Sequence, residues 1–170
     1  MEKNKIATIV MGVSALFLLL SLLTHSWFSE SKGKGDMEMT MGVGIWGSAK
    51  VEMCMSGKCE SKTESMSFSD AKKGKDKAWL AFGKIGFLAG LLSVLALGAA
   101  AAMSWMGNPK LAQACLGSLG GCALTGLCIL MFLFLKPDGL PGIGLSFFLG
   151  VLGVAGGITG AMMGKKVAAG

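Results

Sequence analysis

The sequence predicts an all-α membrane protein, a four-transmembrane-helix bundle with a small disulfide-pinned antiparallel β-sheet in the first extramembrane loop. Three observations predict this fold: an apolar composition, four long apolar runs, and one polar segment in which the side chains alternate in character. Of the 170 residues, 52% are hydrophobic and only 15% are charged, and the mean hydropathy is +0.63. A soluble domain carries about 25% charged residues. We therefore treat residues 1–170 as a single membrane domain.

The four apolar runs are each long enough to cross a bilayer, which takes about 20 residues in a helix. They cover residues 6–27, 78–106, 111–135 and 142–163. Short turn sequences at residues 107–110 and around Pro137 and Pro141 separate the last three runs, so we expect these helices to be antiparallel neighbours. Lys3 and Lys5 precede the first run and no small-residue cleavage site follows it, which predicts an uncleaved anchor.

Tryptophans lie near the ends of the first two runs. Trp27 closes the first run, and Trp79 and Trp105 lie near the two ends of the second. Tryptophan is enriched where a span leaves the membrane, so we expect interfacial positions. Lys84 lies about two turns inside the second run, close enough for its ammonium group to snorkel back to the interface. His25 is the only histidine, and we expect it to have a structural role.

The loop of residues 28–77 contains the predicted sheet. Apolar side chains recur there at every second residue, first at Met37, Met39, Met41, Val43 and Ile45, and again at Val51, Met53 and Met55. This period-two alternation is typical of strands with one apolar face. Ser56-Gly57 is a turn signal with Cys54 and Cys59 on either side, so we predict a hairpin with these two cysteines disulfide-bonded. Closing so short a loop stabilises the fold by about 2 kcal/mol.

The topology follows from the predicted disulfide. A disulfide persists on an oxidising side of the membrane, which places the loop in an extracellular, periplasmic or lumenal compartment and both termini in the cytoplasm. The lysine count points the other way, because the loop of residues 28–77 carries nine of the 16 lysines. We give the cysteines more weight, since a folded ectodomain crosses a membrane despite its lysines.

Glycines at helical spacing predict close helix packing. Those of the last run form one stripe, comprising Gly150, Gly153, Gly156, Gly157, Gly160 and Gly164, and Gly86 with Gly90 and Gly117 with Gly121 repeat the spacing in the second and third runs. In lipid, such a glycine zipper lets helix backbones approach closely. Two interpretations remain at this point: the stripe packs the bundle's own helices, or it also presents the last helix to a partner or to another copy.

The composition excludes several classes of function. All 16 basic residues are lysines, and the absence of arginine argues against nucleic-acid binding. With one histidine and no acidic residue in any run, we expect neither an enzyme nor a bound cofactor or metal. Thiol redox chemistry at Cys115, Cys122 and Cys128 is a less favoured alternative, because a Cys-x-x-Cys motif is missing.

Copper binding by the methionines of the loop is another less favoured alternative. Thioethers favour Cu(I). However, alternate side chains on one strand stand parallel and about 7 Å apart, so one strand alone cannot cage an ion. A partner strand would have to supply further ligands to complement Met37 and Met39.

Several of these features together resemble the claudin and peripheral-myelin-protein superfamily. The residues that carry the resemblance are Trp27 after the first run, Gly44, Ile45 and Trp46 in the loop, and the pair Cys54 and Cys59. Ile45 stands where that family has leucine, and the spacing from Trp46 to Cys54 is longer than in claudins. The resemblance implies a left-handed four-helix bundle under a short antiparallel sheet.

These observations predict a non-enzymatic integral membrane scaffold that acts as an auxiliary or structural subunit of a larger membrane complex. Its expected partners are the lipid bilayer and either other membrane protein subunits or a second copy of the chain, without nucleic acid. Cell–cell adhesion through the ectodomain is the alternative. We also expect Trp46 to pack against the membrane end of the bundle and to fix the sheet to the helices.

Overall fold

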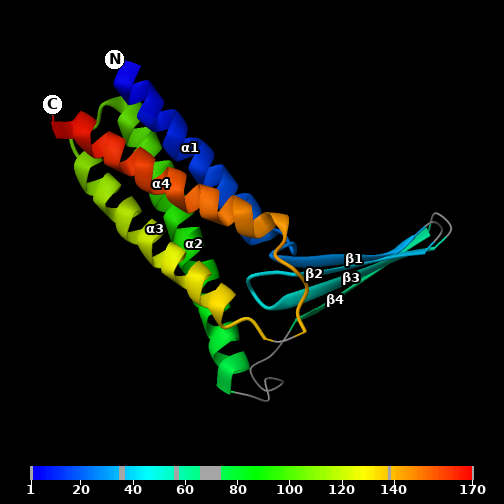
Figure 1. Cartoon of the computed structure of the whole chain (residues 1–170). Coiled ribbons are helices and arrows are strands. Elements are labelled where there is room, and N and C mark those ends of the chain that lie inside the picture. Colours follow the sequence, from blue (N-terminus) through cyan, green and yellow to red (C-terminus); the bar gives the residue numbers. More distant parts are fainter. Residues whose placement is uncertain (1, 35–36, 56–57, 66–73, 138, 170) are drawn as a thin grey trace.

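The computed structural model contains a four-helix bundle with a four-stranded sheet extending from one end (Figure 1). It describes residues 2–34, 37–55, 58–65, 74–137 and 139–169. In chain order the elements are α1 (Glu2–Leu23), β1 (Phe28–Lys34), β2 (Met37–Val43), β3 (Ser48–Met55), β4 (Lys58–Ser65), α2 (Gly74–Met106), α3 (Leu111–Phe134) and α4 (Leu145–Ala169). The predicted turn at Ser56-Gly57 and the predicted helix-start signal at Ser69-Asp70 lie outside the described residues.

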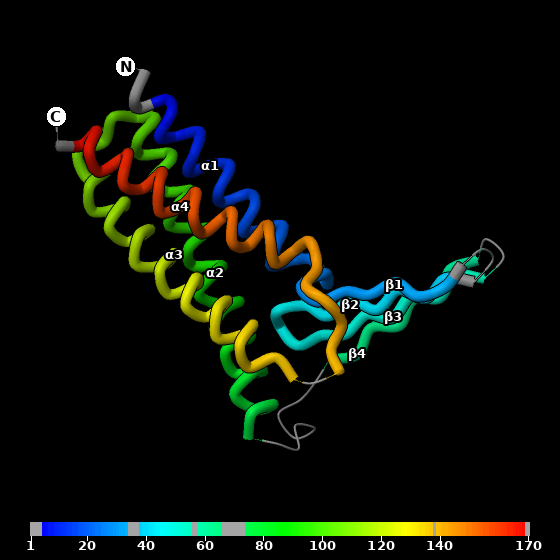
Figure 2. Tube along the Cα trace, viewed as in Figure 1, coloured from blue at the N-terminus to red at the C-terminus, as the bar shows by residue number. Residues whose placement is uncertain are grey.

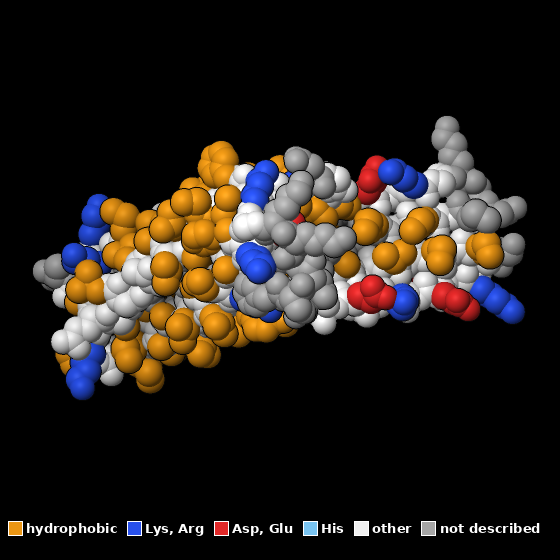
Figure 3. All heavy atoms as spheres, turned by 90° about the horizontal axis from the view of Figure 1, so that it is seen from below, with side chains coloured by type: hydrophobic (Ala, Val, Ile, Leu, Met, Phe, Trp, Pro, Cys, Tyr) orange, Lys and Arg blue, Asp and Glu red, His pale blue; other side chains and the backbone are white. Residues whose placement is uncertain are grey.

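The four helices are each long and apolar enough to cross a membrane, as predicted. They form a ring in which α1 packs against α2 and α4, and α3 packs against the same two helices. Hydrophobic side chains cover the visible flank of the bundle (Figure 3). At 33 residues, α2 is about 50 Å long, well beyond the roughly 30 Å hydrocarbon core, and it extends past the other helices at the sheet end (Figure 1).

The helix boundaries differ from the predicted spans where the chain enters the sheet. α1 ends at Leu23, four residues before Trp27, and α4 begins at Leu145 instead of at residue 142. The reason is backbone pairing between the two excluded segments: Ser29 N–H donates to the Gly142 carbonyl at 2.9 Å, and Gly144 N–H donates to the Trp27 carbonyl at 2.9 Å. Both segments are therefore extended at the sheet end, although their composition is apolar.

The sheet is antiparallel with strand order β1-β2-β3-β4, and it leaves the bundle beside the end of α1 (Figure 2). The sequence predicted β2 and β3 from their alternation. The predicted hairpin around Cys54 and Cys59 implied a strand at β4 but not its bounds, because all eight of its residues are exposed and carry no alternation. The sequence did not predict β1. The alternation predicts Ile45 at the end of the strand that begins at Met37. Ile45 instead lies beyond Val43, in the turn between β2 and β3.

Buried side chains form two clusters along the molecule. One fills the bundle around Met11, Leu18, Leu97, Cys115 and Cys122. The other lies where the sheet meets the helices, and we call its five largest members the anchoring cluster: Trp27, Phe28, Ile45, Trp79 and Phe132. The anchoring cluster takes residues from the start of the sheet, from a strand turn and from two helices, so it joins the sheet to the bundle.

Candidate functional site

Trp27 is the centre of the anchoring cluster. Its side chain is fully buried, its Nε1–H donates to the Ser21 carbonyl at 2.7 Å, and its ring makes edge contacts with Phe132 and Phe147 at about 6 Å. Its depth relative to the membrane stays a prediction, but protein atoms surround the ring on all sides, so the ring does not face lipid headgroups. Trp27 instead holds the junction between α1 and β1 against α3 and α4.

Residues 44–47 form the turn between β2 and β3 and press it into the bundle. Gly44 N–H donates to the Ser48 carbonyl at 2.8 Å, and Gly47 N–H donates to the Gly44 carbonyl at 3.0 Å. Gly47 has a φ of 82°, which side-chain-bearing residues rarely adopt. This tight turn points the Ile45 side chain, only 1% exposed, toward α2.

Trp46 lies on the outside of that turn. It remains 41% exposed, its ring makes an edge contact with Phe87 of α2 at 4.9 Å, and the Lys84 ammonium lies 5.8 Å from the ring centroid. Trp46 therefore contacts the sheet end of the bundle. It does so at the periphery, whereas Ile45 and Trp27 occupy the interior.

Three members of the anchoring cluster were not predicted as site residues: Phe28, Trp79 and Phe132. Trp79 and Phe132 are buried and stack at 4.7 Å between ring centroids, joining α2 to α3 directly below the sheet. Trp79 was expected at the interface, and it is 1% exposed. The small residue Gly83 makes room for this packing, because a Cβ there would clash with the Ile45 carbonyl oxygen. The sequence signal that could have revealed this packing was a tryptophan one helical turn before a glycine.

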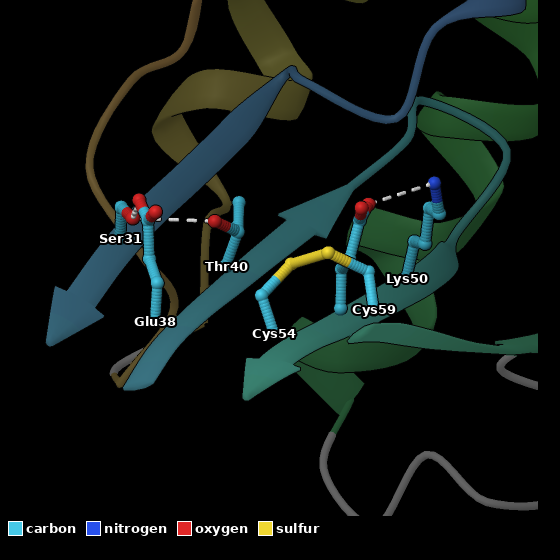
Figure 4. Close-up of a disulfide and its surroundings, with 7 residues drawn as sticks. Ser31, Glu38, Thr40, Lys50, Cys54 and Cys59 are labelled. Carbon is cyan, nitrogen blue, oxygen red and sulfur yellow. Dashed lines mark hydrogen bonds and ion pairs between the residues drawn. A yellow bond between two sulfur atoms is a disulfide. The ribbon is translucent and has the colours of Figure 1, made fainter. Parts of the chain in front are cut away.

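The disulfide between Cys54 and Cys59 is confirmed. The two cysteines are directly paired in the β3–β4 register, and their sulfur atoms are 2.04 Å apart. The disulfide lies on the polar face of the sheet, where Ser31 Oγ donates to Glu38 Oε1 at 2.8 Å and Lys50 forms a salt bridge with Glu52 at 3.1 Å (Figure 4).

The opposite face of the sheet is rich in methionine. In the β2–β3 register, Met39 pairs with Met53 and Met41 pairs with Val51, while Met55 lies next to this row on β3. We call the side of the sheet with Met39, Met41, Met53 and Met55 the methionine face. Figure 3 shows hydrophobic side chains in the middle of the exposed sheet with charged side chains at its borders. Backbone alternation thus separates the thioethers from the disulfide.

An open cavity of about 340 Å³ lies on the polar face, where the sheet meets the end of α1. Its lining is mostly polar and includes His25, Ser29, Thr40, Lys50 and Glu52. The backbone approaches closely here, because a Cβ at Gly42 would clash with the His25 carbonyl oxygen. The only histidine of the chain therefore lies in a pocket between the end of α1 and the sheet, outside the helices.

The glycines predicted to pack helices lie mostly between helices. Among the glycines predicted to pack helices, an added Cβ would touch a neighbouring helix at Gly86, Gly90, Gly121, Gly150, Gly153, Gly156, Gly157, Gly160 and Gly164. On α4 the stripe faces α1 for the most part: a Cβ at Gly160 would lie 2.8 Å from Met11 Cγ, and one at Gly153 would lie 2.8 Å from Leu18 N. The stripe is thus packed against the chain's own helices, and α1 above all.

Gly117 is an exception among these glycines. Nothing lies within 4 Å of a Cβ placed there, because this part of α3 is on the outer surface of the bundle. The prediction that Gly117 packs against another helix is therefore wrong. Its partner in the proposed spacing, Gly121, points inward, where a Cβ would lie 2.8 Å from Ser93 Oγ.

The cysteines of α3 are buried in the bundle. Cys115 and Cys122 face the glycines of α4, and Cys128 faces Gly86 of α2. Glu52, Cys54 and Cys59 lie close enough to hold a metal ion by distance alone. The two cysteines are disulfide-bonded, however, and have no thiolate to offer a metal.

Comparison of the chain with protein-family models and with curated proteins found no match to either. The fold and site define the class of protein in structural terms: a chain with four helices able to cross a membrane and a disulfide-bonded, four-stranded antiparallel sheet at one end. The function is therefore argued from the geometry of the chain itself.

Proposed function

We propose that this chain is a claudin-like, non-enzymatic membrane scaffold that acts as an auxiliary or structural subunit of a larger membrane complex. The observation that carries the proposal is the anchoring cluster. Because buried rings from Trp27, Trp79 and Phe132 join the base of the sheet to three parts of the bundle, the sheet is presented in one fixed orientation. A fixed recognition surface on a membrane base suits a structural subunit.

Beyond the motif residues themselves, three structural features support the claudin-like proposal. The disulfide links β3 to β4, Trp27 lies at the base of the sheet, and residues 44–46 form the turn pressed into the helices. The segment before α4 also pairs with the first strand through a bridge between Phe28 and Ile143. The left-handed crossing of the helices remains a prediction.

For the topology, we propose cytoplasmic termini with the sheet on the oxidising side. Both termini lie at the end of the bundle opposite the sheet (Figure 1). Assigning the sheet to one side of the membrane therefore assigns both termini to the other side. The disulfide favours the oxidising side for the sheet. Antibody access to an added N-terminal tag in intact and permeabilised cells tests this arrangement. A tag that is accessible in intact cells would reverse it.

The mass of the native assembly tests the subunit proposal. When membranes are solubilised in a mild detergent, we expect the 17.5 kDa chain to migrate in a complex larger than itself plus its detergent belt. A harsh detergent serves as the control and should release the single chain. A chain that migrates alone in several mild detergents, and that is not cross-linked to a neighbour in intact membranes, would refute the proposal.

Adhesion between membranes is the second candidate, and the extension of the sheet away from the bundle favours it (Figure 2). Two populations of vesicles carrying the reconstituted chain, each with its own dye, test this function directly. Adhesion predicts mixed clusters of vesicles that reduction of the Cys54–Cys59 disulfide disperses. If clustering is no greater than for protein-free vesicles, the subunit function alone remains.

A further inference from the structure

The β2–β3 register supplies the partner strand that a metal site made of methionines requires. Met39 lies directly opposite Met53, and Met41 and Met55 occupy diagonal positions on the same face. Side chains that are directly opposite have Cβ atoms about 4.5–5.5 Å apart, and diagonal neighbours are about 7–8 Å apart. Methionine has three rotatable bonds beyond the backbone, so the sulfur atoms of Met39, Met53 and one diagonal neighbour can converge on one point above the sheet. Met41 and Met55 are four residues apart along the strands, about 13 Å, so only one of them reaches an ion at a time.

These thioethers are also accessible from solvent. Met39 is 43% exposed, Met53 is 54% exposed and Met55 is 55% exposed. Long apolar side chains in such number are unusual in the middle of a solvated sheet face, where polar or β-branched residues serve a strand better. An ion can reach the sulfur atoms without any opening of the fold.

The charged residues that border the methionines favour a cation at the centre of the row. Lys32, beside Met39, is paired with Glu30 at 3.2 Å. On the other border Glu60 lies opposite Met53, and none of the ion pairs among the described residues engages it. Lys58 lies opposite Met55, toward the far end of the sheet, so the favourable position is at the Met39–Met53 pair.

We propose that the methionine face binds a soft monovalent cation, Cu(I), through the thioethers of Met39 and Met53 together with one diagonal neighbour, Met41 or Met55. Sulfur ligands select Cu(I) over harder ions, and Glu60 offsets part of the ion's charge. The site is independent of the membrane-complex function, since it needs no partner protein. The disulfide takes no part, because Cys54 points to the opposite face.

Silver provides the probe, because Ag(I) has the same charge and softness and needs no reductant that would open the disulfide. The experiment uses the full chain in detergent with ¹³C-labelled methionine methyl groups. We expect Ag(I) to shift the methyl signals of Met39, Met41, Met53 and Met55 and to leave those of the bundle methionines unmoved. This readout requires no variant, so it remains decisive if a substituted chain fails to fold.

A matched pair of variants tests the affinity. Leucine keeps an apolar side chain and removes the sulfur, so M39L/M53L should bind Ag(I) at least about tenfold more weakly, since two of the three ligands are lost. M162L/M163L, which changes two exposed methionines of α4, should bind within about twofold of the wild type for the same reason. The buried thiols of α3 are common to all three proteins. Unmoved sheet methyl signals, or equal affinity of M39L/M53L and the wild type, would overturn the proposal.

Discussion

The base and the outer part of the sheet are built on opposite principles. At the base, the anchoring cluster is closed to solvent, and its rings are packed against two helices and the end of a third. Farther out, the same strands carry exposed methionines on one face, and a salt bridge and hydroxyl groups on the other. The difference indicates that the base determines where the sheet stands, and that the outer part is the portion available for recognition.

Loss of the Trp27 ring should have the largest effect on this arrangement. Trp27→Ala removes a fully buried indole and the hydrogen bond to Ser21, so we expect a loss of about 3–5 kcal/mol in the free energy of unfolding in detergent. Trp105→Ala is the matched control, because that ring is 72% exposed, and Trp46→Ala should fall between the two. A melting temperature for Trp27→Ala equal to that of Trp105→Ala would refute the role of the base.

Next in size is the effect of filling the space between α4 and α1. Gly160→Leu places atoms against Met11, including its backbone nitrogen at 3.1 Å, and should cost at least about 1–3 kcal/mol of stability. Gly117→Leu is the control, since nothing surrounds that position in the structure. Thermal unfolding monitored by circular dichroism compares the two. Equal stability of both variants would show that the α4 stripe is not packed within the chain.

The disulfide should have a smaller effect that is confined to the sheet. Replacing Cys54 and Cys59 by serine removes a short loop constraint that contributes about 2 kcal/mol. Amide hydrogen exchange should therefore accelerate in β3 and β4 while the helices keep their protection, because the anchoring cluster is intact. Intact mass is the companion measurement. If both loop thiols of the wild-type chain react with an alkylating agent before any reduction, the assigned bond is absent.

The base was harder to predict from the sequence than the outer sheet. Period-two alternation and the cysteine spacing identified β2, β3 and the disulfide, since these depend on residues close together in the chain. Only the cysteine hairpin implied β4, because the strand's own side chains are all exposed and show no alternation. The stack of Trp79 on Phe132 joins residues from different helices, so only the packed structure reveals it. Ile45 followed the strand pattern, but the turn directs it into the bundle.

The smallest effect is expected at the exposed border of the sheet, where Lys62 Nζ lies 2.6 Å from Glu64 Oε1. The hydrogen bond and the charge of Lys62 lower the pKa of the Glu64 carboxyl below its ordinary value. The stabilisation is therefore present above the ordinary pKa and is lost as the pH falls through the lowered one. Both side chains are largely exposed, so solvent screens the pair and the melting temperature should not change. Lys62→Ala should raise the pKa of Glu64 toward its ordinary value in a carboxyl ¹³C titration, and Lys58→Ala, six residues before Glu64 on β4, should leave it as it is. If Lys62→Ala leaves that pKa unmoved, the pair does not form in solution, and the outer sheet is even less constrained than its base.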